Sequence, residues 1–168
     1  MTLLGIISDT HGQLEVTKKA RRLFEEQGVS VVIHCGDIGG EAIVRAFEGI
    51  ETHFVFGNID SGDDALRQAA EETGNTFHGW RGEIERANKK ICFMHGHQSE
   101  HFEAELCSER WDLLCIGHTH FPSLQRFGET LLLNPGSLHQ VPVPHVAVVR
   151  LPELEVRNFA LDEVQRVE

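Results

Sequence analysis

Six short runs of apolar residues recur along the chain, and most of them end at Gly, Asp, Asn or His. Continuous apolar runs of this length are typical of strands that are buried on both faces of a sheet. The pattern therefore predicts buried strands at residues 3–7, 29–35, 53–56, 91–94, 113–116 and 130–134.

Helical periodicity lies between several of these runs. Val16, Ala20, Leu23 and Phe24 repeat at the spacing of one helix face, and Gly28 is a favourable residue to end that helix. Strands and helices that alternate at the start of the chain indicate a parallel α/β layer. The pattern predicts helices at residues 15–28, 41–49, 63–74 and 99–110.

The second half of the chain has the signals of β-hairpins. Turn sequences separate pairs of strand-like runs at residues 87–89, 128–129 and 152–153. We therefore expect the end of the chain to be antiparallel. The whole pattern predicts an α/β fold (α+β in four layers) in which two facing sheets are flanked by helices. Because no linker or internal repeat interrupts it, residues 1–168 are expected to form a single domain.

Composition narrows the class of protein. Hydrophobic residues make up 40% and charged residues 24%, as in ordinary folded proteins, and no apolar run reaches the roughly 18 residues of a membrane helix. The N-terminus lacks a basic secretory signal. Four cysteines without a Cys-x-x-Cys pair are typical of small buried side chains in a reducing compartment. We therefore expect a cytoplasmic protein with no membrane partner.

The charge of the chain limits its partners. A formal net charge of −11 disfavours non-specific nucleic-acid binding, which depends on Lys and Arg. It does not exclude a phosphate-bearing substrate, because bound divalent cations reverse the sign of the charge locally.

Candidate ligands for such cations lie where the apolar runs end. The carboxyl ends of strands form the edge of an α/β sheet at which ligands bind. Histidine is unusually frequent, with 11 residues, and several of them stand at these ends. The candidate metal ligands, or close neighbours of ligands, are Asp9, His11, Asp37, Asn58, Asp60, His95, His97, His118, His120, Asn134 and Ser137.

The spacing of these residues is informative. Residues i and i+2 point to the same side of an extended segment, so Asp9 can face one point with His11, and His118 with His120. Oxygen and imidazole ligands together suit first-row divalent metals. The set is too large for one tetrahedral ion, and it fits two ions about 3.5–4 Å apart that share a carboxylate.

Each motif alone has a plainer explanation. Asp-x-His is more often a helix cap or an ion pair, and Gly-Asp and Gly-Asn-x-Asp are common turn sequences. The pair of His118 and His120 is the hardest to explain this way, because histidines at a buried strand end need polar partners. Residues outside the ordered set are expected to be structural: His34 in the core or directly behind the metal ligands, Trp80 in the core or a pocket wall, and His53, His78, His101 and His145 in packing or at the surface.

The ordered set resembles the calcineurin-like metallophosphoesterase superfamily. The motifs are SDTHG, CGD, GNID, HGH, GHTH and NPGS, and they span nearly the full length of the chain. Within the superfamily the chain looks most like the small YfcE-type phosphodiesterases. The resemblance implies an αββα sandwich with a dinuclear site. It implies that Asp9, His11 and His120 hold one ion, that Asn58, His95 and His118 hold the other, and that Asp37 bridges both.

Two departures from the family pattern concern catalysis. Many members carry a His that protonates the leaving group where this chain has Ile59. The proton donor is therefore open, with Asp60, His97 or water as candidates, beside the expected catalytic roles of Asp37, Asn58 and His95. Branch members often follow NPGS with Pro-Arg, whereas this chain has Leu138 and His139. His139 is either a substitute for that arginine or a surface loop residue.

The resemblance implies a function. We expect a dinuclear phosphodiesterase that hydrolyses a small phosphoester with a metal-activated water, with Mn²⁺ as the first choice of metal and Ni²⁺, Co²⁺, Fe²⁺ or Zn²⁺ as others. The alternative is a metal-binding protein-interaction scaffold of the same fold, like the retromer subunit, with little or no catalysis. The sequence leaves the substrate open, and also whether the chain forms a homo-oligomer.

Overall fold

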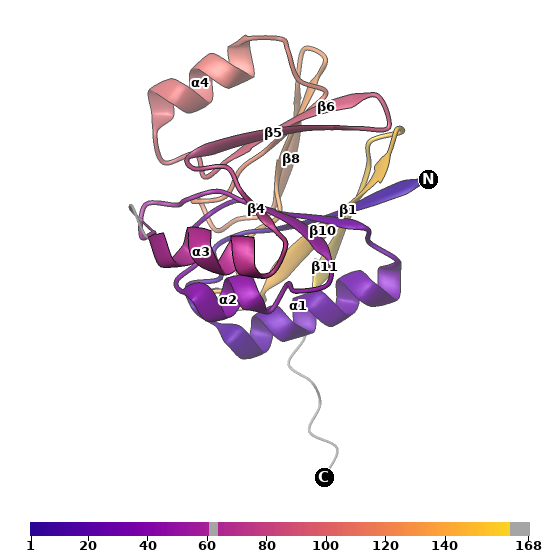
Figure 1. The fold of residues 1–168 in the computed structure, drawn as a ribbon. Helices are drawn as coiled ribbons and strands as arrows, with labels where there is room; N and C mark the ends of the chain where they lie inside the picture. The colour runs from indigo at the N-terminus through magenta and orange to yellow at the C-terminus, as the bar shows by residue number, and fades with distance from the viewer. Residues whose placement is uncertain (61–63, 162–168) are drawn as a thin grey trace.

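The structure is a computed structural model, and it describes residues 1–60 and 64–161. Strands and helices alternate through the first half, and strands dominate the second half (Figure 1). The elements are β1 (Thr2–Ile7), α1 (Leu14–Gln27), β2 (Val31–His34), α2 (Glu41–Arg45), β3 (Glu51–Phe54), α3 (Asp64–Glu72), β4 (Thr76–Phe77), β5 (Arg81–Arg86), β6 (Lys89–Met94), α4 (Ser99–Cys107), β7 (Leu113–Cys115), β8 (Ser123–Phe127), β9 (Thr130–Asn134), β10 (His145–Leu151) and β11 (Glu155–Ala160).

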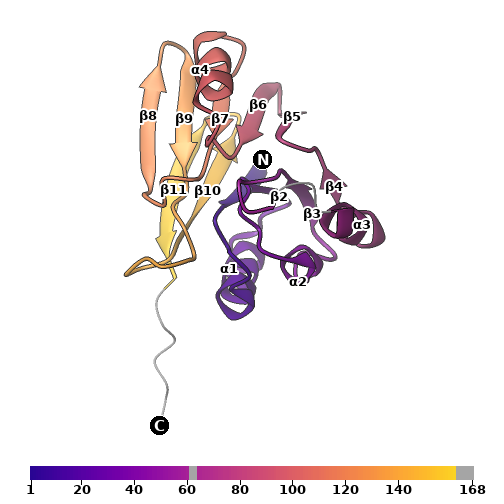
Figure 2. The same cartoon turned by 90° about the vertical axis from the view of Figure 1, so that its left-hand side faces the viewer.

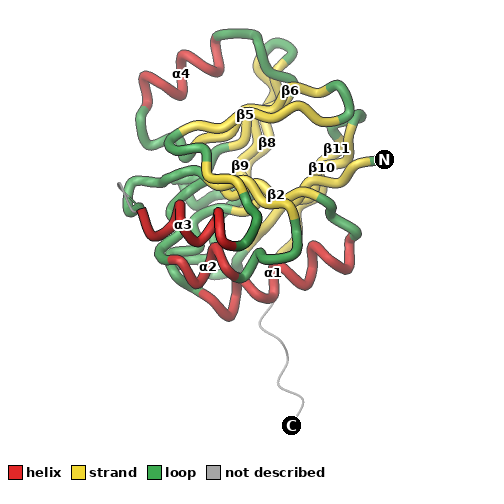
Figure 3. Tube along the Cα trace, in the orientation of Figure 1, coloured by secondary structure: helices red, strands yellow, loops and turns green. Residues whose placement is uncertain are grey.

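Two mixed sheets face each other. The first has the strand order β11-β10-β1-β2-β3-β4, and β1 to β4 are parallel. The second has the order β5-β6-β7-β9-β8, and its three central strands are parallel. Helices α1, α2 and α3 lie outside the first sheet and α4 lies outside the second (Figures 1 and 3). The predicted four-layer sandwich is therefore confirmed.

Apolar side chains fill three layers between these elements. The central core lies between the sheets and includes Ile6 and Ile33 from the first sheet and Phe93 from the second, all fully buried. A second core lies under α1 to α3, and a third lies under α4 around Trp111. Central strands such as β2, β7 and β9 are buried along their whole length, as their continuous apolar sequences predict, whereas the edge strands β8 and β11 are mostly exposed.

The predicted hairpins exist, but the second half is not simply antiparallel. β5 pairs with β6, β8 with β9 and β10 with β11 in antiparallel fashion. In contrast, β6-β7-β9 is parallel. α4 carries the chain from the end of β6 back to the start of β7, and the antiparallel edge strand β8 carries it from the end of β7 back to the start of β9. The β10–β11 hairpin belongs to the first sheet, where β10 lies beside β1 (Figure 2). Hairpin signals describe neighbours along the chain and carry no information on these longer connections.

The helix boundaries differ modestly from the prediction. α2 ends at Arg45, and turns rather than helix continue toward Gly49. α4 ends at Cys107, three residues before the predicted end. Residue 63, the predicted start of the third helix, lies outside the described residues. No helix among the described residues is long and apolar enough to cross a membrane.

Candidate metal centre

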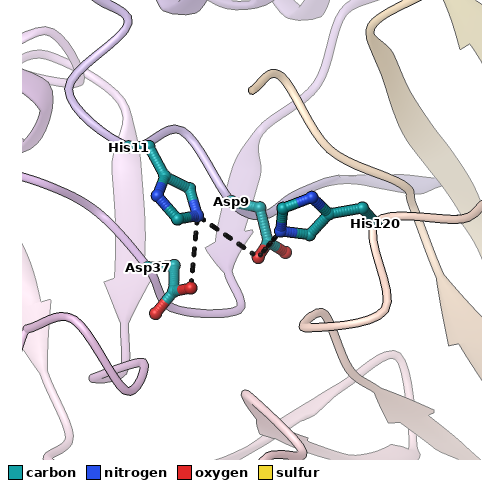
Figure 4. A group of neighbouring side chains, drawn as sticks. All are labelled: Asp9, His11, Asp37 and His120. Atoms are coloured by element: carbon teal, nitrogen blue, oxygen red, sulfur yellow. Dashed lines mark ion pairs between the residues drawn. The ribbon is translucent and has the colours of Figure 1, made fainter. Parts of the chain in front are cut away.

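Four predicted ligands from three separate loops meet at one point. Asp9, His11, Asp37 and His120 each offer an atom, and these atoms all lie within 4.8 Å of one another (Figure 4). Nε2 of His11 lies 3.2 Å from Oδ2 of Asp37 and 3.8 Å from Oδ1 of Asp9. Nε2 of His120 lies 3.1 Å from the same Oδ1 of Asp9. We call Asp9, His11, Asp37 and His120 the first cluster.

The remaining predicted ligands gather on the other side of Asp37. Nε2 of His95 lies 3.3 Å from Oδ2 of Asp37 and 3.0 Å from Oδ1 of Asn58. The ring of His118 lies edge-on to that of His95, with 5.1 Å between centroids. We call Asn58, His95 and His118 the second cluster. Oδ2 of Asp37 thus lies within 3.3 Å of one histidine of each cluster.

The chain does not bring these residues together in the way the spacing argument assumed. Asp9, His11, Asp37, His118 and His120 all have left-handed backbone conformations, with φ between 43° and 67°. They therefore lie in tight turns and not in extended segments, and the same-side argument for i and i+2 was wrong. Asp and His tolerate this conformation better than most non-glycine residues. The turns still bring Asp9 and His11 together, but they send the rings of His118 and His120 to different clusters.

Backbone hydrogen bonds hold the turns in place. The N–H groups of Asp9, His11 and Gly12 donate to the carbonyls of Gly36, Asp37 and Ile38, at 2.9 to 3.0 Å. The ladder between β1 and β2 thereby continues beyond the strands. Because non-glycine residues with positive φ cost about 1–3 kcal/mol each, such bonds are needed to keep the ligands in these turns.

Asp9 is fully buried and its two oxygens have different surroundings. Oδ2 accepts hydrogen bonds from the hydroxyl of Ser8 and the N–H of His118. Oδ1 faces the first cluster and has no hydrogen-bond partner, and neither has Nε2 of His11. Buried polar atoms without partners are costly. A cation at this point would satisfy both atoms, so the residues present fit a metal ion.

His95 of the second cluster also has a nitrogen whose surroundings fit a cation. Its Nδ1 lies 2.8 Å from the carbonyl oxygen of Cys35, which can only accept, so Nδ1 carries a proton. Its Nε2 then faces the oxygens of Asn58 and Asp37, neither of which can donate. The nitrogen needs either a second proton or a cation. Burial works against that proton, but the hydrogen bond to Asp37 and the nearby carboxylates raise the pKa of His95.

Asp37 shows the complementary shift. Burial works to raise its pKa, but the hydrogen bond and charge of His95, together with the N–H of Ile59, lower it to about 2. The carboxylate is therefore ionised at neutral pH, as a metal ligand must be.

Two glycines allow the loops to approach this closely. A Cβ on Gly57 would lie 2.1 Å from both the backbone nitrogen and Oδ1 of Asp37. A Cβ on Gly117 would lie 1.9 Å from Oγ of Ser8 and 2.6 Å from Oδ2 of Asp9. The glycines next to Asn58 and His118 are therefore required by contact.

Asp60 has a role that differs from the expected one. Its two oxygens accept hydrogen bonds from the backbone N–H groups of Ile38, Gly39 and Gly57, at 2.9 to 3.1 Å. The side chain is buried and ties the loop after β2 to the loop after β3. Both oxygens are thus engaged by the backbone, and this geometry disfavours Asp60 as the proton donor.

His34 is a satisfied core histidine, as predicted. Its Nδ1 accepts from the N–H of Gly36, so its proton is on Nε2, which lies 3.0 Å from the hydroxyl of Thr10. Thr10 in turn donates to the carbonyl of Ile38. Complete burial and the nearby charge of His95 lower the pKa of His34 to about 3. This role of Thr10 was not predictable from the sequence, in which only its place in the SDTHG motif drew attention to it.

Asn134 and Ser137 support the ligand loops without facing the clusters. The amide of Asn134 donates to the carbonyl of Gly117 and the hydroxyl of Thr119, and its oxygen accepts from Gly136. The hydroxyl of Ser137 contacts the carbonyl of Asp9 at 3.2 Å. Both residues are therefore neighbours of ligands and hold the loops that carry them.

Three further side chains lie at the edge of the site. His139 stacks on His11, with ring centroids 4.3 Å apart and planes 16° apart. His97 lies 5.5 Å from His95 and 6.2 Å from His118 between ring centroids, and its buried Nδ1 has no partner. Trp80 lies beside His97, with 5.7 Å between centroids. His139 thus contacts a predicted metal ligand and is more than a surface loop residue. In the sequence, only its position shortly after the NPGS motif pointed to the site.

The other histidines lie outside the two clusters. His53 is hydrogen-bonded to Glu51 and His78 at 2.9 Å each. His145 contacts the carbonyl of Val143 at 2.8 Å. His101 is exposed on α4.

Sequence comparison gives a consistent result. A family model of the calcineurin-like phosphoesterase superfamily domain matches residues 2–153. Phosphodiesterase MJ0936 of Methanocaldococcus jannaschii is 27% identical over 165 residues, which cover 95% of this chain and 99% of that protein. Phosphodiesterase YfcE of Escherichia coli is 27% identical over 153 residues, which cover 82% of this chain and 80% of that protein.

Solved structures share the architecture. An archaeal phosphodiesterase matches with a TM-score of 0.89 and 26% identity, over 95% of this chain and 100% of that one. Vps29 of Entamoeba histolytica matches with a TM-score of 0.64 and 20% identity, over 96% of this chain and 100% of that one. The second likeness is one of fold alone.

Proposed function

The chain belongs to the calcineurin-like phosphoesterase superfamily, and we propose that it is a phosphodiesterase that works with two divalent metal ions. The observation that carries the proposal is the position of Asp37. Its Oδ2 lies 3.2 Å from Nε2 of His11 and 3.3 Å from Nε2 of His95. One carboxylate oxygen placed between histidines of two clusters supports a shared ligand for two ions.

The two clusters supply ligands of different charge. The first cluster would hold one ion with the carboxylates of Asp9 and Asp37 and with two imidazoles. The second would hold the other ion with Asp37, two imidazoles and the neutral amide oxygen of Asn58, which leaves that ion more electrophilic. Bound divalent ions lower the pKa of water and neutralise charge on a phosphoryl group. Imidazole and carboxylate ligands support Mn²⁺ as the first choice, with Ni²⁺, Co²⁺, Fe²⁺ and Zn²⁺ as alternatives.

The proton donor for the leaving group is best assigned to water. Ile59, at the position of the usual histidine, is 47% exposed and has no proton to give. The oxygens of Asp60 accept from the backbone. Burial and the nearby charges of His95 and His118 lower the pKa of His97, which leaves less of its proton-donating form at neutral pH. The site therefore favours substrates whose alcohol leaves without strong acid assistance.

The other properties of the chain agree with a small substrate in the cytoplasm. The cysteines are free, and three of them are buried. The net charge of −11 disfavours nucleic-acid binding. The rival function, a scaffold with little catalysis, does not require chemically competent residues at all seven ligand positions, and this chain has them.

A metal titration combined with a turnover assay tests the proposal. The wild type should bind two equivalents of Mn²⁺ and hydrolyse bis(4-nitrophenyl) phosphate. Asp37→Asn keeps the shape of the side chain but removes the shared charge, and should lower kcat/KM by about 100-fold or more and reduce the bound metal below two equivalents. Asp112→Asn, at an ion pair with Lys89, is the control and should match the wild type.

The outcomes separate the hypotheses. Bound metal without turnover would favour the scaffold. Turnover that is unaffected by Asp37→Asn would refute the proposed role of Asp37. One equivalent of metal in a fully active enzyme would refute the dinuclear site.

A further inference from the structure

A tryptophan is exposed beside the candidate metal centre. Trp80 is 42% exposed, although indole rings are usually well buried. Its ring packs against that of Phe56 with 5.3 Å between centroids. The N–H of Phe56 donates to the carbonyl of Gly79 at 2.7 Å, which fixes the segment before Trp80 against the chain that leads to Asn58. The ring is therefore held in place and still open to solvent.

Trp80 lines a cleft that also contains a predicted metal ligand. The cleft is lined by Trp80, Met94, His95, Gly96, His97, Gln98 and His101 and has a volume of only about 10 Å³, so a ligand ring would lie over it and not inside it. It shares His97, Gln98 and His101 with a neighbouring depression of about 370 Å³, lined by residues 97–101 at the start of α4. The cleft and the depression therefore adjoin each other at these three residues, beside the indole ring.

The side chains that line the cleft and the depression indicate which kind of ligand group they would bind. Neither Lys nor Arg is among the described residues that line the cleft and the depression, and Glu100 is their single acidic residue. A second phosphate or a carboxylate on the ligand would find no cation there. Instead, the walls present the rings of Trp80, His97 and His101, which offer flat faces to a planar group.

A phosphodiester has two alcohol arms, and at least one must extend from the metal centre over the surrounding surface. We propose that the exposed ring of Trp80, which lies beside His97 at the edge of the metal centre, binds a planar aromatic group on one ester arm of the substrate by stacking. The aromatic group is an aryl ring or a nucleobase. This inference rests on the proposed function, because it places the phosphoryl group at the two clusters.

Ligand binding tests the cleft separately from catalysis. The Mn²⁺-loaded wild type is titrated with thymidine 5′-monophosphate, phenyl phosphate and methyl phosphate, by calorimetry and by tryptophan fluorescence. The two aromatic phosphates should bind roughly tenfold more tightly than methyl phosphate, and should change the fluorescence. Trp80→Phe retains Trp111 and serves as the spectroscopic blank, in which the fluorescence change should disappear.

Removal of the ring should abolish the preference. Trp80→Ala and the bulkier Trp80→Leu should bind the aromatic phosphates with the affinity of methyl phosphate, and methyl phosphate itself should bind as in the wild type. A preference for thymidine monophosphate over phenyl phosphate would identify a nucleoside arm, and the reverse an aryl arm. Equal affinities for all three ligands in the wild type would overturn the inference. Equal losses for all three in the variants would overturn it too.

The proposed function can fail independently. If bis(4-nitrophenyl) phosphate is not hydrolysed but aromatic phosphates still bind through Trp80, the aromatic subsite stands and the phosphodiesterase does not. If bis(4-nitrophenyl) phosphate is hydrolysed but aromatic phosphates bind no better than methyl phosphate, the phosphodiesterase stands and the aromatic subsite does not.

Discussion

The first and second clusters, which both contact Asp37, differ in how well their ligand side chains are buried and preorganised. In the first cluster Asp9 is fully buried, and the ligand atoms converge within 4.8 Å. In the second cluster His95 is buried, but Asn58 and His118 are exposed. The first cluster is fixed by the continued β1–β2 ladder and by Ser8 and the N–H of His118, which occupy one oxygen of Asp9.

This difference predicts unequal affinities for metal. A site whose ligands are already held by hydrogen bonds loses less conformational entropy when the ion binds. The first cluster should therefore bind its ion more tightly, and the second should exchange its ion more readily. The second cluster also borders the cleft with Trp80, so the less constrained ion lies on the side where we place the substrate arm.

His118 and His120 allow the largest test of this comparison, because one substitution can be made on each side from the same loop. His120→Ala should weaken the tighter ion by about 100-fold and abolish most activity. His118→Ala should leave the tighter ion within about threefold of the wild type and weaken the second ion by about 10- to 100-fold. Calorimetric titration with Mn²⁺ measures both affinities, and excess Mn²⁺ should restore activity to His118→Ala more fully than to His120→Ala. If both variants weaken the same ion, the division into two clusters is wrong.

The fold was predictable wherever the sequence pattern is local. Runs such as residues 130–134 are apolar because helices and the facing sheet bury both faces of the strand, and the hairpin at residues 87–89 follows from its turn residues. The parallel order β6-β7-β9 was not predictable in the same way. It depends on the path of α4 across the sheet, which no local pattern records.

Four of the predicted ligands, Asp9, His11, Asp37 and His120, come together in the structure, but the geometry that joins them was not predictable. The ligand types at the strand ends identify the cluster, because carboxylates and imidazoles rarely gather there without a function. The left-handed turns at His118 and His120 could not be read from the spacing, since i and i+2 residues would share a side only in an extended chain. The engagement of Asp60 by three backbone N–H groups was hidden for a similar reason, because it depends on contacts between loops.

His34 allows a second test, because it contacts Thr10 and Gly36 beside the ligands of the first cluster and makes the stability of the fold depend on pH. The pKa of His34 is about 3 in the folded protein, against 6.5 for the free side chain. A histidine with a lowered folded pKa stabilises the fold fully above the unfolded value, and this contribution is lost as the pH falls from 6.5 toward 3. Between pH 7 and pH 5 the metal-free protein should therefore lose about 2 kcal/mol of unfolding free energy through His34.

Urea unfolding of the metal-free protein at both pH values measures this effect. His34→Gln removes the titrating group, so the difference between pH 7 and pH 5 should be about 2 kcal/mol smaller in the variant than in the wild type. His95 has a raised pKa and acts in the opposite direction, but it is present in both proteins and cancels in the comparison. An identical pH dependence in the two proteins would show that the loop around Thr10 and Gly36 opens before His34 is protonated.

The smallest expected effect on metal affinity comes from His139, which stacks on the His11 ring of the first cluster. Its ring is nearly parallel to that of His11, 4.3 Å away, and limits the orientations that His11 can adopt. His139→Ala should weaken the tighter ion by about threefold, which corresponds to the loss of one aromatic contact. His139→Phe keeps the stacked ring and should bind the ion within about twofold of the wild type. A positioning role therefore predicts rescue by phenylalanine in the Mn²⁺ titration. If both variants bind Mn²⁺ like the wild type but raise KM for the phosphodiester alike, His139 contacts the substrate instead.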